Sequence, residues 1–291
     1  MAPSPEPVNQ GEAVLVELGP RGPAVVGGPR SPFLRADDLG ALRGDGVFEH
    51  FLVVDGQPRH LDEHLCRLAA SAAMVDLALP APEEWKAAVE GGARAWRGPG
   101  EWAMRLVCTR GPERGGPPCA YALGQELAPA VLRQRREGIA VLTLERGLRK
   151  GLAPEAPWLL LGAKTLSYAV NMAAKRWAQA NGADDAIFVG TDGAVWEGGN
   201  SAVVASFGRR LVSPPTSVGI LDSISVRTLF VAAESAGWEV ARAELCVADL
   251  FAAEGLWLSS SLRFARVHTL DGKGLAPCPA HEVLASLAAN C

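Results

Sequence analysis

The chain has 291 residues, with 28 lysines and arginines against 32 aspartates and glutamates, so its formal net charge is −4. Apolar residues make up 48% of the sequence, which supplies a packed core and excludes disorder over most of the chain. A mildly acidic chain without basic blocks is not typical of proteins that bind nucleic acids or membrane surfaces. The sequence has no run of about 18 apolar residues, and its Pro-rich start over 1–12 has no signal pattern. We therefore expect a soluble, cytoplasmic protein.

The cysteines and histidines do not show the spacing of a metal site. The six cysteines are scattered along the chain, and the five histidines form no HExxH pattern. Scattered cysteines in a chain of this size are expected to be reduced and mostly buried. No metal is therefore expected. The cysteines are Cys66, Cys108, Cys119, Cys246, Cys278 and Cys291.

The first half of the chain alternates predicted strands and helices. Apolar residues that recur every three or four positions predict helices at 60–75 and 85–96. Short runs rich in β-branched and aromatic residues predict strands, which fall at 13–18, 48–54, 102–108 and 119–123. A polar, basic stretch at 125–137 then predicts a domain junction. We expect a small N-terminal α/β domain over 1–130 and a large C-terminal domain over 131–291.

The second half is richer in strands. It restarts with a predicted strand at 139–144, and an apolar face over Leu166, Ala169, Val170, Ala173, Ala174 and Trp177 predicts a helix at 165–180. A strand meander is expected at 186–207, followed by a helix at 224–236 and closing strands at 256–259 and 266–270. Because strands outnumber helices here, the fold class is predicted to be α+β and not a doubly wound parallel sheet.

Two charged residues stand at the ends of predicted elements in apolar surroundings. Lys164 directly follows an apolar run, and desolvation lowers the pKa of an amine, whose neutral form makes a Schiff base. The pattern alone favours the alternative, a lysine at the start of a helix with its amine in water. Glu197 lies beside Trp196, ahead of a Gly-Gly-Asn-Ser loop. It is either the partner of a protonated ring nitrogen or an ordinary residue of a surface turn.

Two serine clusters are candidate anion sites. Ser223 and Ser225 open a predicted helix, where free N–H groups and hydroxyls bind anions. Ordinary N-capping explains one of these serines without a ligand. Ser259 and Ser261 end a predicted strand, where hydroxyls contact a phosphate or form a turn.

Taken together and in order, these segments resemble the fold-type-IV enzymes that depend on pyridoxal phosphate (PLP). This class includes branched-chain and D-amino-acid aminotransferases and aminodeoxychorismate lyases. The resemblance extends from about residue 35 to 272. The matching segments are 43–49 (RGDGVFE), 64–68 (HLCRL), 164–168 (KTLSY), 181–185 (NGADD), 192–198 (DGAVWEG), 219–225 (GILDSIS) and 257–263 (WLSSSLR).

The resemblance implies a role for each matching residue. Lys164 matches the lysine that forms the Schiff base with PLP, and Glu197 matches the carboxylate that pairs with the ring nitrogen. Arg67 matches an arginine on the cofactor phosphate, for which a planar cation is suited. The remaining phosphate contacts that it implies are Ile224, Ser225 and Ser261. Ser223 stands where the family has glycine, and Ala202 stands where it usually has asparagine, so the roles of Asn200 and Ser201 stay open.

Within this class the sequence favours aminodeoxychorismate lyase, which converts 4-amino-4-deoxychorismate to 4-aminobenzoate and pyruvate, a step of folate precursor synthesis. The step from Lys164 to Tyr168 resembles the lyase and D-amino-acid branches of the class, and the turn at 261–263 resembles lyases. The loop at 109–116 does as well, and its Arg110 and Arg114 suit a substrate with two carboxylates, although a solvated loop explains them equally. The alternative is an aminotransferase acting on branched-chain or D-amino acids with 2-oxoglutarate.

The resemblance also implies the assembly. We expect PLP between the two domains, where ligand sites are common, and a homodimer. A non-catalytic binding protein on the same scaffold is disfavoured, because it has no need to keep Lys164, Arg67 and Glu197 together.

Overall fold

The computed structural model of the protein describes residues 13–28, 30, 31 and 33–290, so the Pro-rich start and Cys291 lie outside the described residues. The chain divides into two compact units. The first comprises the described residues up to Ala128 together with Ala163–Tyr168, and the second comprises Pro129–Gly162 and the chain from Ala169 onward. Lys164 therefore belongs to the first unit. A single boundary near residue 130 would place it in the second.

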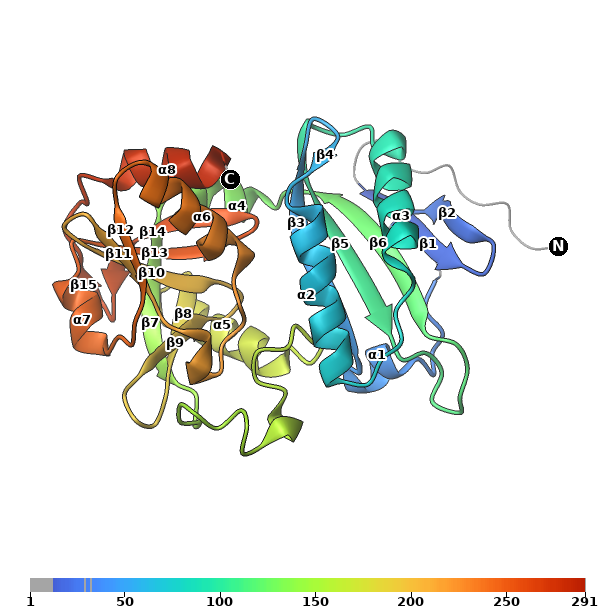
Figure 1. The fold of residues 1–291 in the computed structure, drawn as a ribbon, viewed down its shortest axis with the longest axis horizontal. Coiled ribbons are helices and arrows are strands. Elements are labelled where there is room, and N and C mark those ends of the chain that lie inside the picture. Colours follow the sequence, from blue (N-terminus) through green and yellow to red (C-terminus); the bar gives the residue numbers. More distant parts are fainter. Residues whose placement is uncertain (1–12, 29, 32, 291) are drawn as a thin grey trace. The chain divides into compact units, whose positions relative to one another are not determined.

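The first unit is a six-stranded antiparallel sheet with helices (Figure 1). The strand order is β2-β1-β6-β5-β3-β4. The strands are β1 (Ala13–Gly19), β2 (Gly22–Gly27), β3 (Gly46–Val54), β4 (Gln57–Pro58), β5 (Glu101–Thr109) and β6 (Cys119–Glu126). The helices are α1 (Leu39–Arg43), α2 (Leu61–Met74) and α3 (Pro82–Ala95).

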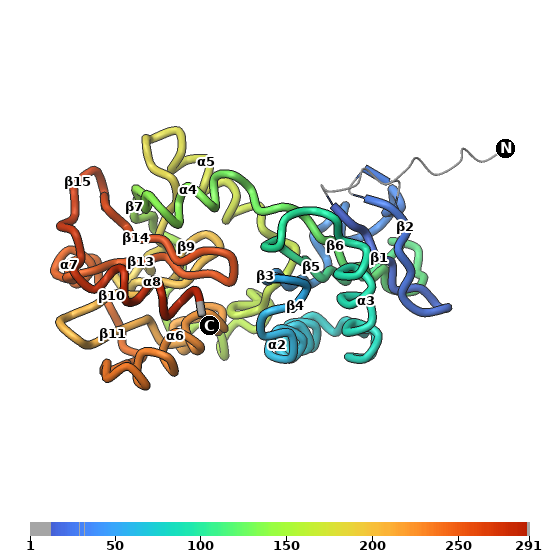
Figure 2. The backbone as a smooth tube through the Cα atoms, turned by 90° about the horizontal axis from the view of Figure 1, so that it is seen from above, coloured from blue at the N-terminus to red at the C-terminus, as the bar shows by residue number. Residues whose placement is uncertain are grey.

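The core of the first unit lies on one face of this sheet. Alternate strand residues such as Phe51 and Met104 are fully buried there, because successive side chains of a strand point to opposite faces. Leu68 of α2 and Trp85 of α3 cover them, and Figures 1 and 2 show both helices on the same side of the sheet. Within the described residues of the unit, α2 and α3 do not cover the opposite face of the sheet.

The segment Ala163–Tyr168 runs along the free edge of β3. Thr165 forms an antiparallel bridge with Val47, and the Phe48 N–H donates to the Lys164 carbonyl at 3.1 Å. Gly44 has φ +69°, and a Cβ atom there would lie 2.8 Å from the Ser167 hydroxyl oxygen. A glycine is therefore required where this segment approaches the chain ahead of β3.

The second unit holds a nine-stranded mixed sheet of order β12-β11-β10-β13-β14-β7-β8-β9, with β15 paired to β14. Its strands are β7 (Ile139–Glu145), β8 (Asp185–Val189), β9 (Val195–Gly198), β10 (Ala202–Phe207), β11 (Arg210–Ser213), β12 (Glu239–Arg242), β13 (Gly255–Ser260), β14 (Arg263–Leu270) and β15 (Lys273–Gly274). Its α-helices are α4 (Pro129–Glu137), α5 (Ala169–Ala180), α6 (Ile224–Ser235), α7 (Val247–Ala252) and α8 (His281–Asn290). Two short 3₁₀ helices lie at Pro157–Leu159 and Thr216–Val218.

A buried ion pair joins two of the matching sequence segments inside the second unit. Arg263, at the start of β14, donates to Asp185 of β8 at 2.7 Å, and both side chains are almost fully buried. The Arg263 guanidinium also donates to Gln134 of α4 at 2.5 Å. Because a buried charge is stable only when it is paired, these partners explain why the two segments carry an acid and an arginine.

The predicted α+β class is confirmed, but several elements differ from prediction. The stretch at 125–137, predicted as a domain junction, contains the end of β6 and all of α4, and the chain passes from the first unit to the second inside it, between Ala128 and Pro129. The helix predicted at 165–180 begins at Ala169, because the preceding residues pair with β3. The predicted meander is wrong beyond β9, since β10 pairs with β11 and β13.

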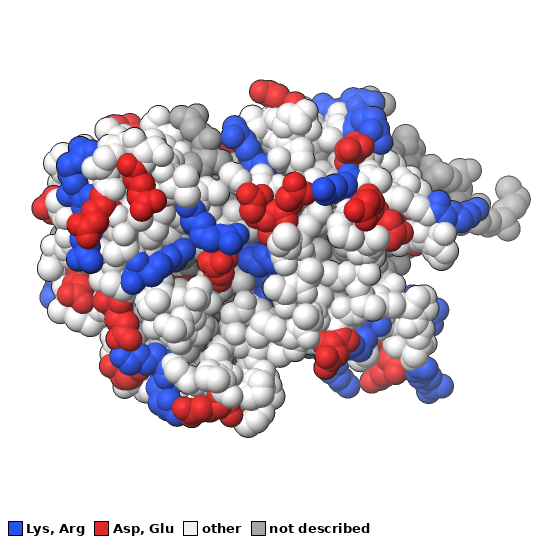
Figure 3. Space-filling view, viewed as in Figure 1, with Lys and Arg blue, Asp and Glu red and all other residues white. Residues whose placement is uncertain are grey.

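The cysteine expectation holds only in part. No disulfide joins the five cysteines in the described part of the chain, of which Cys108 and Cys278 are buried and Cys66 and Cys246 are exposed. On the face drawn in Figure 3, lysine and arginine are interspersed with aspartate and glutamate. None of the helices built from the described residues is both long and apolar enough to cross a membrane.

Candidate active site

Lys164 is a buried lysine held among aromatic rings. Only 9% of its surface is exposed, and its Nζ lies 4.4 Å from the centre of the Phe48 ring and 5.7 Å from that of Tyr168. Its backbone N–H donates to the buried Ser71 hydroxyl of α2 at 3.0 Å. This burial contradicts the alternative of an amine that extends into water from the start of a helix. The amine instead lies over the faces of π systems, which attract a cation.

A buried polar cluster links β3 to α2 beside this lysine. Glu49 is fully buried, and its carboxylate accepts two hydrogen bonds from Arg67, at 2.7 and 2.8 Å. The second Glu49 oxygen also lies 2.6 Å from His64 Nδ1. The helical spacing of His64, Arg67 and Ser71 places them on the face of α2 that meets β3 and Lys164. Arg67, predicted to contact a phosphate, is thus oriented by a carboxylate.

The surroundings of Glu49 determine its charge. Burial alone would raise the pKa of Glu49, but the hydrogen bonds and charges of Arg67 and His64 lower it to about 2. Burial lowers the pKa of His64, and the bond to Glu49 opposes that effect. Glu49 and His64 were not predicted as site residues. The available signal was a glutamate in an otherwise apolar series of inward-facing positions, with Val47, Phe51 and Val53.

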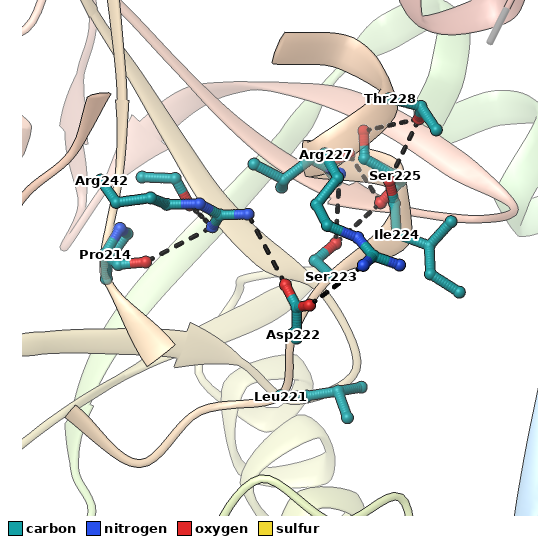
Figure 4. A network of polar contacts seen from close by, with 12 residues as sticks. Pro214, Leu221, Asp222, Ser223, Ile224, Ser225, Arg227, Thr228 and Arg242 are labelled. Atoms are coloured by element: carbon teal, nitrogen blue, oxygen red, sulfur yellow. Dashed lines mark hydrogen bonds and ion pairs between the residues drawn. The ribbon is translucent and has the colours of Figure 1, made fainter. Parts of the chain in front are cut away.

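In the second unit, the N-terminus of α6 carries a network of hydroxyl groups, shown in Figure 4. The Ser223 hydroxyl caps the helix by accepting from the Val226 N–H at 3.3 Å and lies 3.0 Å from the Ser225 hydroxyl. The Ser259 hydroxyl donates to the Ser225 oxygen at 3.2 Å. The N–H groups of Ile224 and Ser225 belong to the first turn, where the helix itself provides no acceptor. The site therefore combines N-capping with groups that suit an anion.

Asp222, which directly precedes Ser223, lies near two arginines, Arg227 and Arg242 (Figure 4). Asp222 lies 3.4 Å from Arg227 and 3.9 Å from Arg242. Ser261 lies in the two-residue turn between β13 and β14, and Arg135 of α4 donates to the carbonyl of the next residue at 2.6 Å. The helix start and this turn are thus each fixed by arginine contacts.

Glu197 is connected to the loop that leads into α6. Its carboxylate accepts from the Leu221 N–H at 3.3 Å. Gly219 in that loop has φ +107°, and a Cβ atom there would meet the Trp196 ring at 3.4 Å. The loop therefore packs on β9, and the second unit brings Glu197 together with Ser223, Ile224 and Ser225. The alternative of an isolated surface turn does not describe this position.

The two loop arginines differ in their surroundings. Arg110 is engaged within the first unit, where its guanidinium donates to Asp45 at 2.6 Å and to the carbonyls of Val75 and Asp76. Arg114 is exposed in the loop between β5 and β6. The geometry therefore assigns Arg110 to holding the loop and leaves Arg114 accessible to a ligand.

These residues fit the cofactor that the sequence resemblance implies. The first unit provides a buried amine beside aromatic rings and an oriented arginine. The second provides hydroxyl and N–H groups for a phosphate, and a carboxylate suited to a protonated ring nitrogen. These are the complementary groups for the aldehyde, phosphate and pyridine nitrogen of PLP.

Comparison with known proteins agrees with this chemistry. Residues 46–269 match the family model "Amino-transferase class IV". A bifunctional aminodeoxychorismate lyase / D-amino acid transaminase of Mycobacterium tuberculosis is 45% identical over 269 residues, covering 89% of this chain and 93% of that protein.

Solved structures agree as well. A hypothetical aminotransferase from M. tuberculosis, solved with PLP and with α-ketoglutarate and PMP, is 43% identical at a TM-score of 0.91, covering 95% of this chain and 97% of that one. The fold IV transaminase CpuTA1 from Curtobacterium pusillum is 37% identical at a TM-score of 0.89, covering 96% and 98%. The chain therefore belongs to the class IV aminotransferase family and is a PLP-dependent enzyme.

Proposed function

We propose that this enzyme is a 4-amino-4-deoxychorismate lyase that releases 4-aminobenzoate and pyruvate. The observation that carries the proposal is the 45% identity, over 89% of the chain, to a relative named for this activity. The exposed Arg114 supports it, because a cation suits a substrate with two carboxylates. This makes Arg114, and no longer Arg110, the proposed substrate contact of that loop.

The proposal gives each site residue a task in holding the cofactor. The Lys164 amine would hold the aldehyde end of PLP, and Glu197 would keep its ring nitrogen protonated. The phosphate is bound by Arg67, the Ile224 N–H, and the hydroxyls of Ser225 and Ser261. The hydrogen bonds between Ser225, Ser223 and Ser259 support this role, because they fix the hydroxyl direction before a ligand arrives.

Lys164 also moves the proton in this scheme. When bound, PLP withdraws electrons from the reacting carbon of the amino substrate. In the lyase reaction the Lys164 amine would take the proton from that carbon as a general base and then, as a general acid, give a proton to the three-carbon group that leaves as pyruvate. Its burial beside Phe48 and Tyr168 supports this role, because the amine is held in a site shielded from water.

D-amino-acid transamination is the second candidate function. It is favoured by the same relative, whose name includes both activities, and by the relative solved with α-ketoglutarate and PMP. Transamination of branched-chain amino acids is the weaker form of this alternative, because no such activity is named for those two relatives. Cytoplasmic location, folate precursor synthesis and a homodimer also belong to the proposal and are supported by the family alone.

The test is a direct comparison of the two reactions with one preparation of holoenzyme. We expect 4-aminobenzoate and pyruvate from 4-amino-4-deoxychorismate, with slower formation of glutamate from 2-oxoglutarate and D-alanine. Turnover near ~10 s⁻¹ is typical of an enzyme on its own substrate. Transamination at this rate without 4-aminobenzoate formation would overturn the lyase proposal and leave the transaminase.

A further inference from the structure

The turn that carries Ser261 does not have the backbone that its strands favour. It joins β13 to β14 with two residues, Ser261 and Leu262. Two-residue hairpins favour turns with positive φ angles, which match the twist of the strands. The next hairpin of this sheet follows that rule, since Asp271 and Gly272 have φ +48° and +74°. Neither Ser261 nor Leu262 has a positive φ, so contacts with other elements must hold this turn.

Helix α4 provides one group of these contacts. Arg135 donates to the Leu262 carbonyl through two nitrogen atoms, at 2.8 and 2.6 Å. Gln134, the preceding residue of α4, accepts a hydrogen bond of 2.5 Å from Arg263, the residue that follows the turn. The side chains of Gln134 and Arg263 are both buried. The helix therefore holds the end of the turn and the strand that leaves it.

Asp185 provides the charged partner. It accepts from Arg263 at 2.7 Å, and the two side chains are 1% and 6% exposed. The pair joins β8 to β14, which are not neighbours in the sheet, because β7 lies between them. Burying two charges is costly, and apolar residues of similar volume often give equal or greater stability. A need to fix the geometry of the turn therefore explains this pair better than stability does.

The same carboxylate lies beside the loop that follows Glu197. A Cβ atom on Gly199 would lie 3.5 Å from Asp185 Oδ1. The Asn171 side chain of α5 holds this loop by donating to the Gly199 carbonyl at 2.6 Å. Strand β9, which ends just after Glu197, pairs directly with β8. Asp185 is thus a shared anchor for the Ser261 turn and for the strand that carries Glu197.

The end of β13 also contacts the N-terminus of α6. The Ser259 hydroxyl donates to the Ser225 oxygen at 3.2 Å, and Ser261 follows two residues later. A shift of the turn would therefore move Ser261 relative to Ser225 and the Ile224 N–H, the other proposed phosphate contacts of the second unit. Hydrogen bonds weaken steeply when their distance and angle depart from the optimum.

We infer that Arg263 is a positioning residue for the phosphate of the cofactor. Held by Asp185 and Gln134, it fixes the turn that presents Ser261, and it does not itself touch the cofactor. The inference rests on the proposed function, which assigns the Ser261 hydroxyl to the phosphate. Loss of Arg263 is therefore expected to weaken recognition of the phosphate more than recognition of the ring and the aldehyde.

The test compares two probes, PLP and pyridoxal. Pyridoxal has the same ring and aldehyde without the phosphate, so the dissociation constant of pyridoxal divided by that of PLP measures the contribution of the phosphate. The full chain, freed of cofactor, is titrated with each probe by visible absorbance. Arg263→Met is compared with Ser261→Ala and with the control Leu250→Ala. Leu250 is a fully buried core residue of the same unit, on α7, which carries no proposed cofactor contact.

Arg263→Met should raise the dissociation constant of PLP about tenfold or more and that of pyridoxal less than twofold, because a hydrogen bond to a charged group is weakened. Ser261→Ala should have the same effect. The two changes combined should weaken PLP binding no further than the larger single effect, because both act through one hydroxyl. Leu250→Ala should lower the thermal midpoint and leave the ratio unchanged. A merely structural arginine predicts that same result for Arg263→Met.

An unchanged ratio in Arg263→Met, or a lowered ratio in Leu250→Ala, would overturn the inference. Arg263→Met leaves Asp185 unpaired, so the variant protein can fail to fold. Arg263→Met combined with Asp185→Asn then carries the same test, because it removes both charges and keeps the acceptor for the Ala186 N–H.

The outcomes also separate this inference from the proposed function. A lowered ratio in Ser261→Ala with an unchanged ratio in Arg263→Met refutes the inference alone. An unchanged ratio in Ser261→Ala contradicts the proposed phosphate contact, and the inference with it. The titrations do not depend on which reaction occurs. Loss of both the lyase and the transaminase assays in the wild-type enzyme would therefore count against the proposed reaction alone.

Discussion

Lys164 is fixed in place mainly through its backbone. Its carbonyl accepts from Phe48 and its N–H donates to Ser71, so the segment keeps its contacts when the side chain is shortened. The side chain itself contributes the amine, which lies over two aromatic rings. Structure and chemistry at this position are therefore separable by substitution.

Lys164→Ala is expected to abolish turnover and the visible absorbance of the bound cofactor, while the fold stays intact. The change in the free energy of unfolding should stay near ~1 kcal/mol, since the backbone contacts that hold the segment are kept. Absorbance spectra and thermal unfolding measure the two effects. Lys175→Ala on α5 is the control and should keep activity. An unfolded Lys164→Ala protein would show that the amine is part of the core.

Acid should destabilise the first unit through residues of β3. The pKa of His50 is about 3 in the folded chain against 6.5 for a free histidine, so His50 stabilises the fold above pH 6.5 and less as the pH falls. Glu49, with a pKa of about 2 against 4.5, adds a loss below pH 4.5. In both cases the unfolded chain takes up the proton first, and stability decreases with falling pH.

For His50 the expected loss between pH 7 and pH 5 is about 2 kcal/mol, from 1.36 kcal/mol for each pH unit below 6.5. Urea unfolding at several pH values measures it. His50→Gln removes the titrating group, so the variant should lose much less stability over the same range. Equal pH dependence of the two proteins would contradict the assignment to His50.

At the scale of elements, the loop ahead of β3 requires glycine for two reasons. Gly44 has φ +69°, which strains any L side chain, and it faces Ser167 of the segment that carries Lys164. Gly56, in the turn after β3, has φ +78° but has no atom within 4 Å of an added Cβ. Comparing substitutions at Gly44 and Gly56 therefore separates the effect of backbone strain from that of steric contact.

Gly44→Ala and Gly56→Ala should each lose about 1–2 kcal/mol of stability from the left-handed backbone. Only Gly44→Ala must also displace Ser167, and with it the position of Lys164. We therefore expect kcat to fall tenfold or more in Gly44→Ala and to stay near the wild-type value in Gly56→Ala. Thermal unfolding and steady-state kinetics of both variants check this. Equal kinetics would show that the segment adapts without moving the amine.

Local patterns predicted the longer elements well and the pairings between distant ones poorly. The periodicity over 60–75 identified α2, and the run of β-branched and aromatic residues over 48–54 identified most of β3. The same periodicity extended α5 too far, because the pairing of Thr165 with Val47 replaces helix in the first residues. The strands β11 and β12 pair in parallel, and α6 lies between them in the chain. With four residues each, they are too short to show a pattern that predicts a strand.

The candidate site was predictable where single residues stand at the ends of elements. Lys164, Glu197 and the serines of α6 carry such signals. The partners of Arg67 were not predictable, because Glu49 reaches it only when β3 packs on α2. The role of Arg110 likewise depends on Asp45, the carboxylate that the fold brings near it.

At the scale of the whole molecule, most of the apolar face predicted for α5 is not buried within the chain. Val170 is 60% exposed and Trp177 is 61% exposed, while Ala174 and Ala178 are the buried residues of this helix. Val170 and Trp177 are two turns apart, so they lie on one side of α5. An amphipathic stripe that the chain itself leaves uncovered is typical of a surface that contacts another molecule. The proposed homodimer offers a second copy of this chain as that partner.

We expect the protein to elute at about twice its 30.5 kDa mass in size-exclusion chromatography with light scattering. Val170→Asp should shift it toward the mass of a monomer, because a carboxylate buried in an apolar interface without a partner is strongly unfavourable. Val231→Asp on α6 is the matched control, since Val231 is 65% exposed on a helix of the same unit and lies outside the stripe. A dimer that survives Val170→Asp, or a monomeric wild type, would exclude α5 as the contact between subunits.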